Sequence, residues 1–425
     1  MSDGEAARQR PVQLDDGGAL SAARSPSMLR RINAEVVLRA IRETGPVSCA
    51  QISRATGLSR PTVLGVADQL VEAGFVSEAE VEAPPGARRP GRPARLLRFR
   101  AEFGHVLGLD IGAHKILALV ADLSGRVCGA ERRTGIGGSA AGVLEQAAGA
   151  IQGALAQAGV GPESLVEAVV GTPGVIDPAT GSIALAPQLP GWEGLRLAVE
   201  LERTVPCRVT VENEVRAALV AELARGAAHD HDPVAYLQIG IGIGCAMTIG
   251  GRLHRGAWGA SGEIGYLPLF DLPTEAAERG FGAFEYSAGG TAIARLGAES
   301  AAQPAGAAIL EAAGSLEAVD ARAVFAAARR GDRVALDIVD RAALGLARGI
   351  ASVSLLIDPE LVVLGGGLSR AGDLLVDPIR RALGDLVPRP PALTVTTLGD
   401  EVVALGAIEL ALEAARQRLF AFESA

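Results

Sequence analysis

Glycine-containing turns follow apolar segments at four places in this sequence, and each turn has the composition of a phosphate-binding loop. The first is the most informative, because Asp110 and Gly112 lie between two apolar segments. Backbone N–H groups of such a turn can approach an anion, and the carboxylate can hold magnesium or its water. The later turns contain Gly171, then Gly240 with Gly242, and then Gly366 within a glycine triplet. Together they predict a site for phosphate groups and, at the last turn, an adenosine.

Each turn needs a strand in front of it, and the apolar runs of the sequence supply these strands. Residues 106–109 precede the first turn, and residues 116–120 follow it. Residues 234–237 and 361–364 are comparable runs before the later glycines. Short apolar runs bounded by turn residues are typical of buried strands. The separation of the first and third turns predicts two related lobes, each beginning with a strand and a glycine turn.

The residues before the first lobe have the pattern of a helix-turn-helix. Helical periodicity begins at Met28 and stops at residue 44, and a second helix is predicted over residues 49–56. A three-residue turn, 57–59, then leads into a third helix that would lie in the major groove of DNA. An ordinary three-helix bundle without DNA contacts is the alternative. The residues expected to face the DNA are Ser59, Arg60 and Thr62.

An arginine-rich segment follows the third helix. Gly74 opens an apparent β-wing, and residues 87–95 combine arginine with proline and glycine around Gly91-Arg92-Pro93. Such a segment is slender, so its guanidinium groups can enter a narrow A·T minor groove, where negative potential attracts them. The same run of charge is also compatible with a solvated linker. The arginines expected in the groove are Arg88, Arg89 and Arg92.

Charge is distributed unevenly along the 425 residues. Residues 1–105 contain 15 arginines and 12 acidic residues, whereas the whole chain has a net charge of −9. The acidic body argues against indiscriminate binding of polyanions, and the front end has the mild positive charge of a local DNA contact. Four cysteines without CxxC spacing are typical of reduced cytoplasmic thiols. Because no apolar run reaches about 18 residues, we expect no membrane span.

Taken together, these motifs resemble the ROK family (repressor, open reading frame, kinase). The resemblance extends from about residue 106 to 415, and the winged helix with its Gly-Arg-Pro core is similar to the repressor branch. It implies a two-lobed actin-like ATPase fold, RNase H-like and shared with sugar kinases, behind an N-terminal winged helix-turn-helix. The most specific matches are Thr172-Pro173-Gly174-Val175-Ile176-Asp177, Pro190-Gly191-Trp192, Arg255-Gly256-Ala257, Gly262-Glu263-Ile264-Gly265 and the triplet beginning at Gly365.

The chain departs from the family's kinases at positions that serve catalysis. The kinases have Asp-Ile-Gly-Gly-Thr-Lys in the first turn, whereas this chain has Ala113 and His114, and Ile241 replaces a threonine in the third turn. A Cβ and an imidazole in the first turn disfavour γ-phosphate binding. Glu214 stands at the position of the catalytic aspartate, and a base misplaced by about 1 Å can cost roughly 10²-fold in rate. We also expect Arg216 to pair with Glu214 and to depress its basicity.

The family's zinc motif is replaced as well. Tyr266 stands where the family has a histidine ligand, and residues 278–283 lack the cysteines of the motif. A tetrahedral zinc site needs thiolate or imidazole ligands at these positions. We therefore expect neither a metal ion nor another cofactor in this chain.

The family's sugar contacts are partly retained. In the family, the positions of Asn213, Glu263 and Glu285 hydrogen-bond sugar hydroxyls, and Glu214 and Tyr266 would lie beside them. Polar planar groups that converge in one cleft suit a polyol, because each hydroxyl both donates and accepts. Surface or helix-capping roles are the alternative for Glu263 and Glu285.

The sequence therefore predicts a ligand-responsive transcriptional repressor whose kinase chemistry has been lost. Its expected partners are operator DNA, a sugar-like effector and a second copy of the chain, since half-site recognition favours a homodimer or a higher homo-oligomer. An ATP-dependent sugar kinase with residual activity and a ligand-independent DNA-binding regulator are the alternatives. The expected parts are a disordered arm (1–26), a winged helix-turn-helix (27–100), a first lobe (105–230 with 402–420) and a second lobe (231–401).

Overall fold

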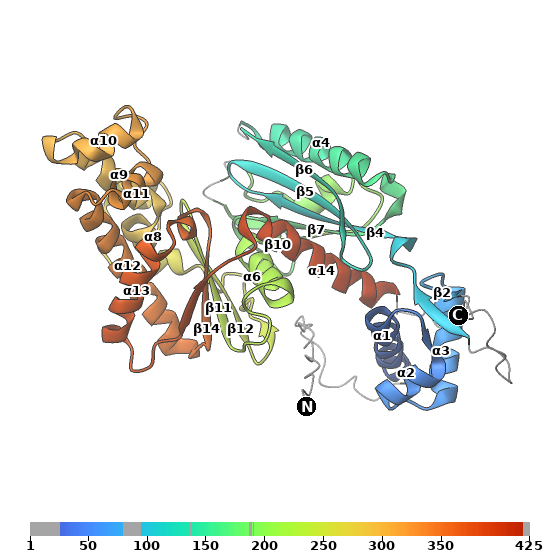
Figure 1. Ribbon diagram of the computed structural model, residues 1–425. Coiled ribbons are helices and arrows are strands. Elements are labelled where there is room, and N and C mark those ends of the chain that lie inside the picture. Colours follow the sequence, from blue (N-terminus) through green and yellow to red (C-terminus); the bar gives the residue numbers. More distant parts are fainter. Residues whose placement is uncertain (1–25, 80–94, 136–137, 187–188, 190, 420–425) are drawn as a thin grey trace.

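The computed structural model has three folded parts, and the C-terminal helix returns to the second of them (Figure 1). The structure describes residues 26–79, 95–135, 138–186, 189 and 191–419, so the expected N-terminal arm lies outside the described residues except for residue 26. We call the described part of residues 26–100 the head, 105–230 with 402–419 the first lobe, and 231–401 the second lobe. The predicted α/β fold behind an N-terminal helix-turn-helix is confirmed.

The head is a three-helix unit closed by a small antiparallel sheet of order β1-β3-β2. Apolar residues at three- and four-residue steps, among them Ala34, Val37 and Ile41, are fully buried and hold the first helix against the other two. The predicted helix over residues 49–56 is confirmed. The elements are α1 (Pro26–Thr44), β1 (Val47–Ser48), α2 (Cys49–Thr56), α3 (Arg60–Glu72), β2 (Val76–Ala79) and β3 (Leu96–Phe99).

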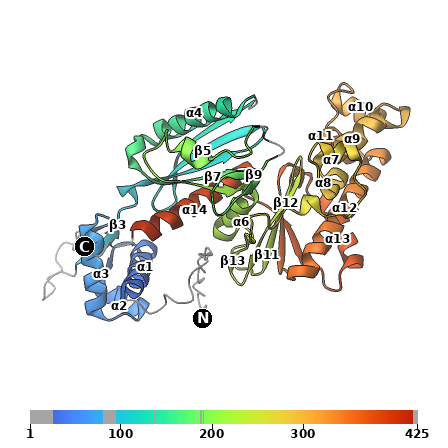
Figure 2. The ribbon, with the colours of Figure 1, turned by 180° about the vertical axis from the view of Figure 1, so that it is seen from behind.

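The first lobe is built on a five-stranded sheet of order β10-β7-β4-β5-β6. β4 pairs antiparallel with β5 and parallel with β7. At the two edges, β6 pairs antiparallel with β5, and β10 pairs parallel with β7. Helix α4 covers one face, and α6 and α14 cover the other (Figures 1 and 2). The elements are η1 (Ala101–Phe103), β4 (His105–Ile111), β5 (Lys115–Asp122), β6 (Val127–Thr134), α4 (Ala140–Ala158), η2 (Pro162–Ser164), β7 (Leu165–Thr172), β8 (Val175–Ile176), β9 (Ile183–Leu185), α5 (Leu197–Leu201), β10 (Val209–Asn213), α6 (Glu214–Arg225) and α14 (Val402–Leu419).

The second lobe repeats this topology with the order β13-β12-β11-β14-β15. β11 again pairs antiparallel with the next strand and parallel with a later one, so the predicted relation between the lobes is confirmed. The elements are β11 (Val234–Ile239), β12 (Ile243–Ile249), β13 (Arg252–Leu253), η3 (Ile264–Tyr266), α7 (Thr274–Glu278), α8 (Ala283–Ala288), α9 (Gly290–Ala301), η4 (Pro304–Gly306), α10 (Ala307–Ala313), α11 (Ala321–Arg329), α12 (Arg333–Ile357), β14 (Leu361–Gly365), η5 (Gly367–Ala371), α13 (Asp373–Leu386), β15 (Ala392–Val395) and η6 (Gly399–Glu401).

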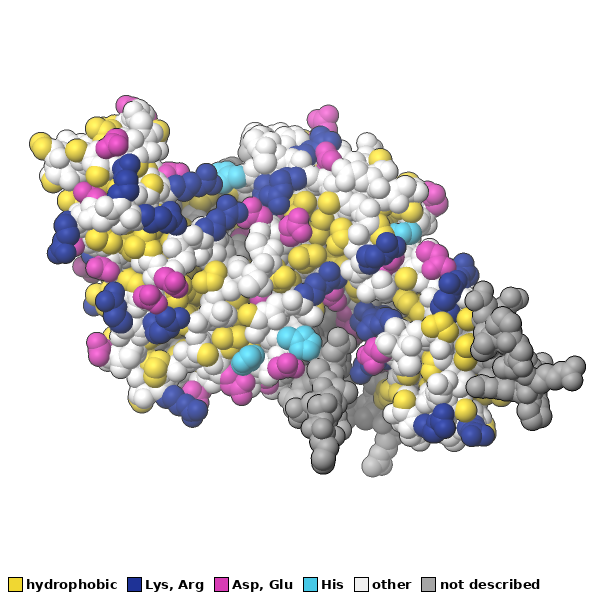
Figure 3. Space-filling view, in the orientation of Figure 1, with side chains coloured by type: hydrophobic (Ala, Val, Ile, Leu, Met, Phe, Trp, Pro, Cys, Tyr) yellow, Lys and Arg dark blue, Asp and Glu magenta, His cyan; other side chains and the backbone are white. Residues whose placement is uncertain are grey.

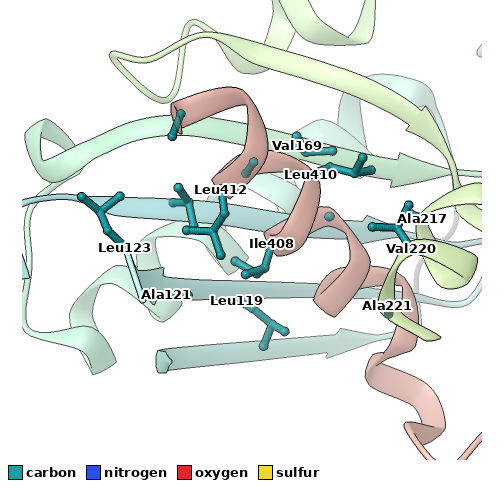
Figure 4. Packing of buried hydrophobic residues seen from close by; sticks show 14 of the residues in the cluster. Leu119, Ala121, Leu123, Val169, Ala217, Val220, Ala221, Ile408, Leu410 and Leu412 are labelled. Carbon is teal, nitrogen blue, oxygen red and sulfur yellow. The ribbon is translucent and has the colours of Figure 1, made fainter. Parts of the chain in front are cut away.

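Helix α14 returns from the second lobe and packs across the first sheet beside α6. Figure 4 shows Ile408 and Leu412 of this helix among apolar residues of the strands. Small residues allow the close approach: a Cβ on Gly108 of β4 would lie 2.4 Å from a carbonyl of α14, and one on Gly406 would lie 1.7 Å from the Ala217 carbonyl. A larger side chain at Gly108 would push α14 off the sheet, and one at Gly406 would push α14 away from α6.

Alternating residues of β11 face two different cores. Val234 and Tyr236 belong to the cluster that surrounds α6 and α14, whereas Ala235 and Leu237 belong to the cluster beneath the helices of the second lobe. A third cluster lies under α4 and includes Trp192, which is buried. Among the residues that the structure describes, no helix combines the length and the apolar character needed to cross a membrane.

Candidate DNA-binding surface and ligand site

The recognition helix α3 presents its first turn to solvent. Ser59 caps this helix, because its hydroxyl accepts a hydrogen bond from the Thr62 N–H at 3.3 Å and lies 2.8 Å from the Thr62 hydroxyl. Gly57 ends α2 with φ at 73°, a left-handed conformation that suits glycine and sets the turn. Arg60 is exposed, while Val63 on the other side of α3 is buried. Figure 3 shows basic side chains along the lower edge of the head.

One arginine at the end of the predicted minor-groove segment has a partner within the head. Arg95 forms ion pairs with Asp68 of α3 and with Glu78 of β2, the latter at 2.8 Å. These contacts tie the base of the wing to the recognition helix. The predicted groove residues Arg88, Arg89 and Arg92 lie outside the described residues, so their contact with DNA stays a prediction.

The first glycine turn holds its carboxylate in an ion pair. Asp110 is buried, and Lys115 Nζ lies 2.8 Å from its Oδ2. Lys115 also donates a hydrogen bond to the Asp400 carbonyl just before α14, and its own carbonyl accepts one from the Gly112 N–H at 2.9 Å. Burial raises the pKa of Asp110, while the charge of Lys115 acts in the opposite direction. Lys115 thus supplies the opposite charge that a buried carboxylate requires.

The other glycines of the predicted phosphate turns fall into two groups. Gly240 and Gly366 lie in turns after β11 and β14; the Gly240 N–H donates to the Gly242 carbonyl at 2.9 Å, and Gly366 has φ at 80°. Gly171, by contrast, lies inside β7, where an added Cβ would come 2.5 Å from Val403 Cγ1. The strand continues through Gly171 and does not turn there. The absence of a side chain at Gly171 instead allows α14 to pack closely on the sheet.

Glu214 is the first residue of α6 and is half-buried where the two lobes meet. Burial and the carboxylate of Asp110 raise the pKa of Glu214 to about 8, and the charge of Glu263 acts in the same direction. Lys115 and a hydrogen bond with Gln238 of β11 oppose this shift. At neutral pH the carboxyl therefore holds its proton most of the time. In that form it donates a hydrogen bond and does not take a proton from a hydroxyl.

The predicted ion pair between Arg216 and Glu214 is wrong. The Nε of Arg216 lies 2.6 Å from a carboxylate oxygen of Glu212, and its Nη1 donates to the Gly259 carbonyl at 3.0 Å. Residues two positions apart on a helix do not face each other, so Arg216 points away from Glu214. Arg255 of the second lobe reaches Glu212 at 2.8 Å. Burial would raise the pKa of Glu212, but the two arginines lower it overall.

Two of the predicted sugar contacts are helix caps in the structure. The Oδ1 of Asn213 accepts hydrogen bonds from two N–H groups in the first turn of α6, and its Nδ2 donates to the Gly174 carbonyl at 3.0 Å. One oxygen of Glu285 accepts from the Gly282 N–H at 3.0 Å, and the other accepts from the Ile243 N–H at 3.3 Å. Each of these acceptor oxygens has further lone-pair capacity, so contact with ligand hydroxyls stays a prediction.

Glu263 and Tyr266 lie at the two ends of one short turn in the second lobe. Tyr266 is 42% exposed, and its O–H donates to the Gly280 carbonyl at 3.1 Å. Burial raises the pKa of Glu263, and nearby Arg216 and Glu285 act on it in opposite directions. Arg216 belongs to the first lobe and Glu285 to the second, so charges of both lobes act on Glu263. We call the set Asp110, Asn213, Glu214, Glu263, Tyr266 and Glu285 the interlobe site.

Comparison with known proteins identifies the family to which this chain belongs. A model of the ROK family matches residues 106–414. The chain belongs to the ROK family. A model of the IclR helix-turn-helix domain matches residues 33–80, which cover most of the head and include α2 and α3.

Relatives of this ROK protein include repressors and kinases. The xylose repressor of Caldicellulosiruptor bescii is 25% identical over 391 residues, which span 91% of this chain and 96% of that protein. A glucokinase of Thermotoga maritima is 35% identical over 224 residues, or 51% of this chain and 69% of that protein. The solved structure of a ROK family transcriptional regulator, a homologue of the E. coli Mlc protein, has a TM-score of 0.75 at 23% identity and spans 92% of this chain and 99% of its own.

The segment at the position of the ROK zinc motif is ordered by aromatic contacts. The rings of Phe281 and Tyr286 meet edge to face with centroids 5.9 Å apart, and Arg279 lies over the Phe281 ring at 5.5 Å. Phe284 is fully buried in the hydrophobic cluster of the second lobe. Within the described ranges, no group of three or more His, Cys, Asp or Glu side chains is arranged to hold a metal ion.

Sequence reasoning missed the buried cluster of Glu212, Arg216 and Arg255. The pair of Glu212 and Arg216 could have been predicted, because the two residues are four positions apart and opposite charges at that spacing commonly pair. The third member had no local signal, since Arg255 comes from the other lobe.

Proposed function

We propose that this ROK protein is a sequence-specific DNA-binding regulator, specifically a repressor, whose lobes sense a sugar or a sugar derivative without phosphorylating it. The observation that carries the proposal is the head, where Arg60 is exposed on the first turn of a capped recognition helix. Helix-turn-helix proteins contact base edges with these N-terminal residues. A repressor relative that aligns along 91% of the chain supports the same function.

The proposal that phosphorylation is absent rests on the residues that would perform it. Asp110 is already paired with Lys115, and Glu214 holds its proton near neutral pH. Ile241, 41% exposed in the third turn, offers no hydroxyl to a phosphate. Phosphoryl transfer depends on positioning and on stabilising charge, so these features act against both requirements. The glucokinase relatives make residual kinase activity the second candidate function.

For the effector we propose a polyol held at the interlobe site. A ligand hydroxyl both donates and accepts hydrogen bonds. A protonated Glu214 can donate to it, and an oxygen of the Glu263 carboxyl can accept from it. The phosphate turns that contain Asp110, Gly112, Gly240, Gly242 and Gly366 are then vestigial. The residues proposed to contact the effector are Asn213, Glu214, Glu263, Tyr266 and Glu285.

Regulation follows from the two lobes. An effector that contacts both lobes favours their closed arrangement, and the change in lobe position alters the affinity of the heads for operator DNA. We propose that a homodimer or higher homo-oligomer places two heads on two half-sites, as twofold operators require. A repressor of this kind works in the cytoplasm, where its operator is.

The experiment is a thermal-shift screen of monosaccharides, amino sugars and their phosphates, combined with a coupled ADP-release assay on the same sugars. We expect one chemical class to raise the unfolding temperature without any turnover. Glu214→Asp should not restore turnover, because Ala113, His114 and Ile241 are unchanged. Turnover by the native protein on any sugar would establish the kinase instead. Operator binding that ignores every stabilising sugar would establish a ligand-independent regulator.

A further inference from the structure

Residues 100–104 run from the last residue of the head to the residue before β4 of the first lobe, and we call them the joint. Backbone hydrogen bonds leave the joint in both directions. The Arg100 N–H donates to the Phe75 carbonyl in the head at 2.9 Å. On the other side, the Leu123 N–H of the first lobe donates to the Ala101 carbonyl at 3.0 Å. The joint is therefore bonded to both of the bodies that it connects.

Phe103 fills the head side of the joint. Its ring meets that of Phe75 edge to face, with centroids 5.1 Å apart. It also lies against the backbone of Gly74, where an added Cβ would come 2.6 Å from Phe103 Cε2. The guanidinium of Arg100 lies 5.4 Å from the ring centroid, and its Nη1 donates to the Gly74 carbonyl at 3.3 Å. Contacts with Phe75, Gly74 and Arg100 thus hold the Phe103 ring in place, although 43% of the residue is exposed.

The first-lobe side of the joint is tightly packed too. A Cβ on Gly104 would lie 2.9 Å from Val166 Cγ1, so the chain enters the sheet in direct contact with the start of β7. A second contact lies beside the joint, where α1 approaches α14 (Figure 1). One hydrophobic cluster continues from the head, where it includes Ile41 of α1, into the first lobe, where it includes Ala415 of α14. The head is therefore docked on the first lobe at two places.

We propose that the joint holds the head and the first lobe as one rigid body, with Phe103 as the positioning residue. This inference rests on the proposed function, because it specifies how effector binding reaches the DNA-binding surface. Closure of the lobes moves the second lobe against the combined body of first lobe and head. The effector therefore reorients the heads together with their first lobes, and it does not release the heads on loose tethers.

The direct test is hydrogen exchange on the full chain carrying Phe103→Ala. The backbone amides of Arg100 and Leu123 should exchange at least about tenfold faster than in the native protein, because local opening of the joint becomes easier. Phe270→Ala is the matched control, since Arg348 lies over that ring at the same 5.4 Å in the second lobe. The control should leave both amides at native rates. Native protection of both amides in Phe103→Ala would overturn the proposal, whatever the protein binds.

A second measurement separates positioning from folding. Phe103→Leu keeps apolar bulk but loses the aromatic and cation contacts, so its exchange rates should fall between those of the native and alanine proteins. The matching readout is binding to a duplex selected from a random pool, with and without D-xylose or D-glucose, whichever stabilises the native protein. Phe103→Ala should keep the sugar-induced rise in Tm and lose the sugar-induced change in duplex affinity. A native-sized change would contradict the positioning role, whereas a native protein that binds no duplex would sink only the proposed function.

Discussion

The head and the interlobe site use polar residues in opposite ways. Arg60 is presented to solvent on α3, whereas Asp110, Asn213 and Glu285 are already bonded to other groups of the protein. A rigid duplex needs donors that stand free on an exposed surface, while groups between two lobes must stay paired when no ligand is present. DNA contact can therefore be inferred from one helix. Ligand contact depends on pairings between distant segments.

The largest effect should come from removing Glu212, which pairs with buried Arg216 of the same lobe and with Arg255 of the second lobe. Glu212→Ala leaves Arg216 buried without its carboxylate, which should cost about 3–5 kcal/mol in the free energy of unfolding. Glu200→Ala is the control, because its exposed pair with Arg203 should contribute less than about 1 kcal/mol. Urea unfolding followed by circular dichroism measures both. Equal, small losses in the two variants would show that this part of the site is not held by charge pairing.

Next in size is the contact with the effector. Glu263→Ala removes a carboxyl that has no capping role, so it should weaken effector binding by about 1.5–3 kcal/mol, near 10–150-fold. Its operator affinity without effector should stay native. Glu285→Ala, in contrast, also removes the cap of α8 and should lower the unfolding temperature. If both variants respond to the effector as the native protein does, the effector binds elsewhere.

Substitution in the recognition helix should cause a similar loss of binding free energy, but the loss should concern a single base position of the operator. Arg60→Ala should cost about 1–3 kcal/mol and relax the preference at one base position in each half-site. Arg380→Ala, which removes an exposed arginine of α13, should leave operator affinity unchanged. Replacing Arg92 should mainly weaken the preference for A·T flanks. Competition binding with single-base operator variants measures these effects, and a uniform loss across all positions for Arg60→Ala would mean a phosphate contact instead.

A pH dependence of stability, rather than of binding, is expected from Glu214. Its pKa of about 8 means that the native state keeps a proton that the unfolded chain releases above about pH 4.5. Stability therefore falls as pH rises through this interval, and Glu214→Gln removes that loss. The variant should have a higher Tm than the native protein at about pH 8.5 and a clearly smaller advantage at about pH 5.5. An advantage that does not change with pH would refute the raised pKa.

Features that depend on neighbouring residues could be predicted from the sequence. The second helix follows from periodicity and its flanking turn, and the repeated strand-turn pattern predicts two lobes of one topology. The pairing of Arg255 with Glu212 and the hydrogen bond of Lys115 to the Asp400 carbonyl could not be predicted in the same way, because they depend on which distant segments meet after folding. Arg216 was paired with the wrong carboxylate because a helix places side chains two residues apart on different faces, whereas Glu212 lies four residues away. Gly171 was misassigned because a glycine needed for close packing looks the same in sequence as one needed for a turn.

The central claim is that this ROK protein recognises a DNA sequence through its head, and a binding titration tests it most directly. The full chain is titrated at about 150 mM salt with a duplex selected from a random pool and with an unselected duplex of the same length. We predict tighter binding to the selected duplex by at least about 10³-fold, and a loss of most of that difference in Arg60→Ala. Equal affinity for the two duplexes would contradict the account.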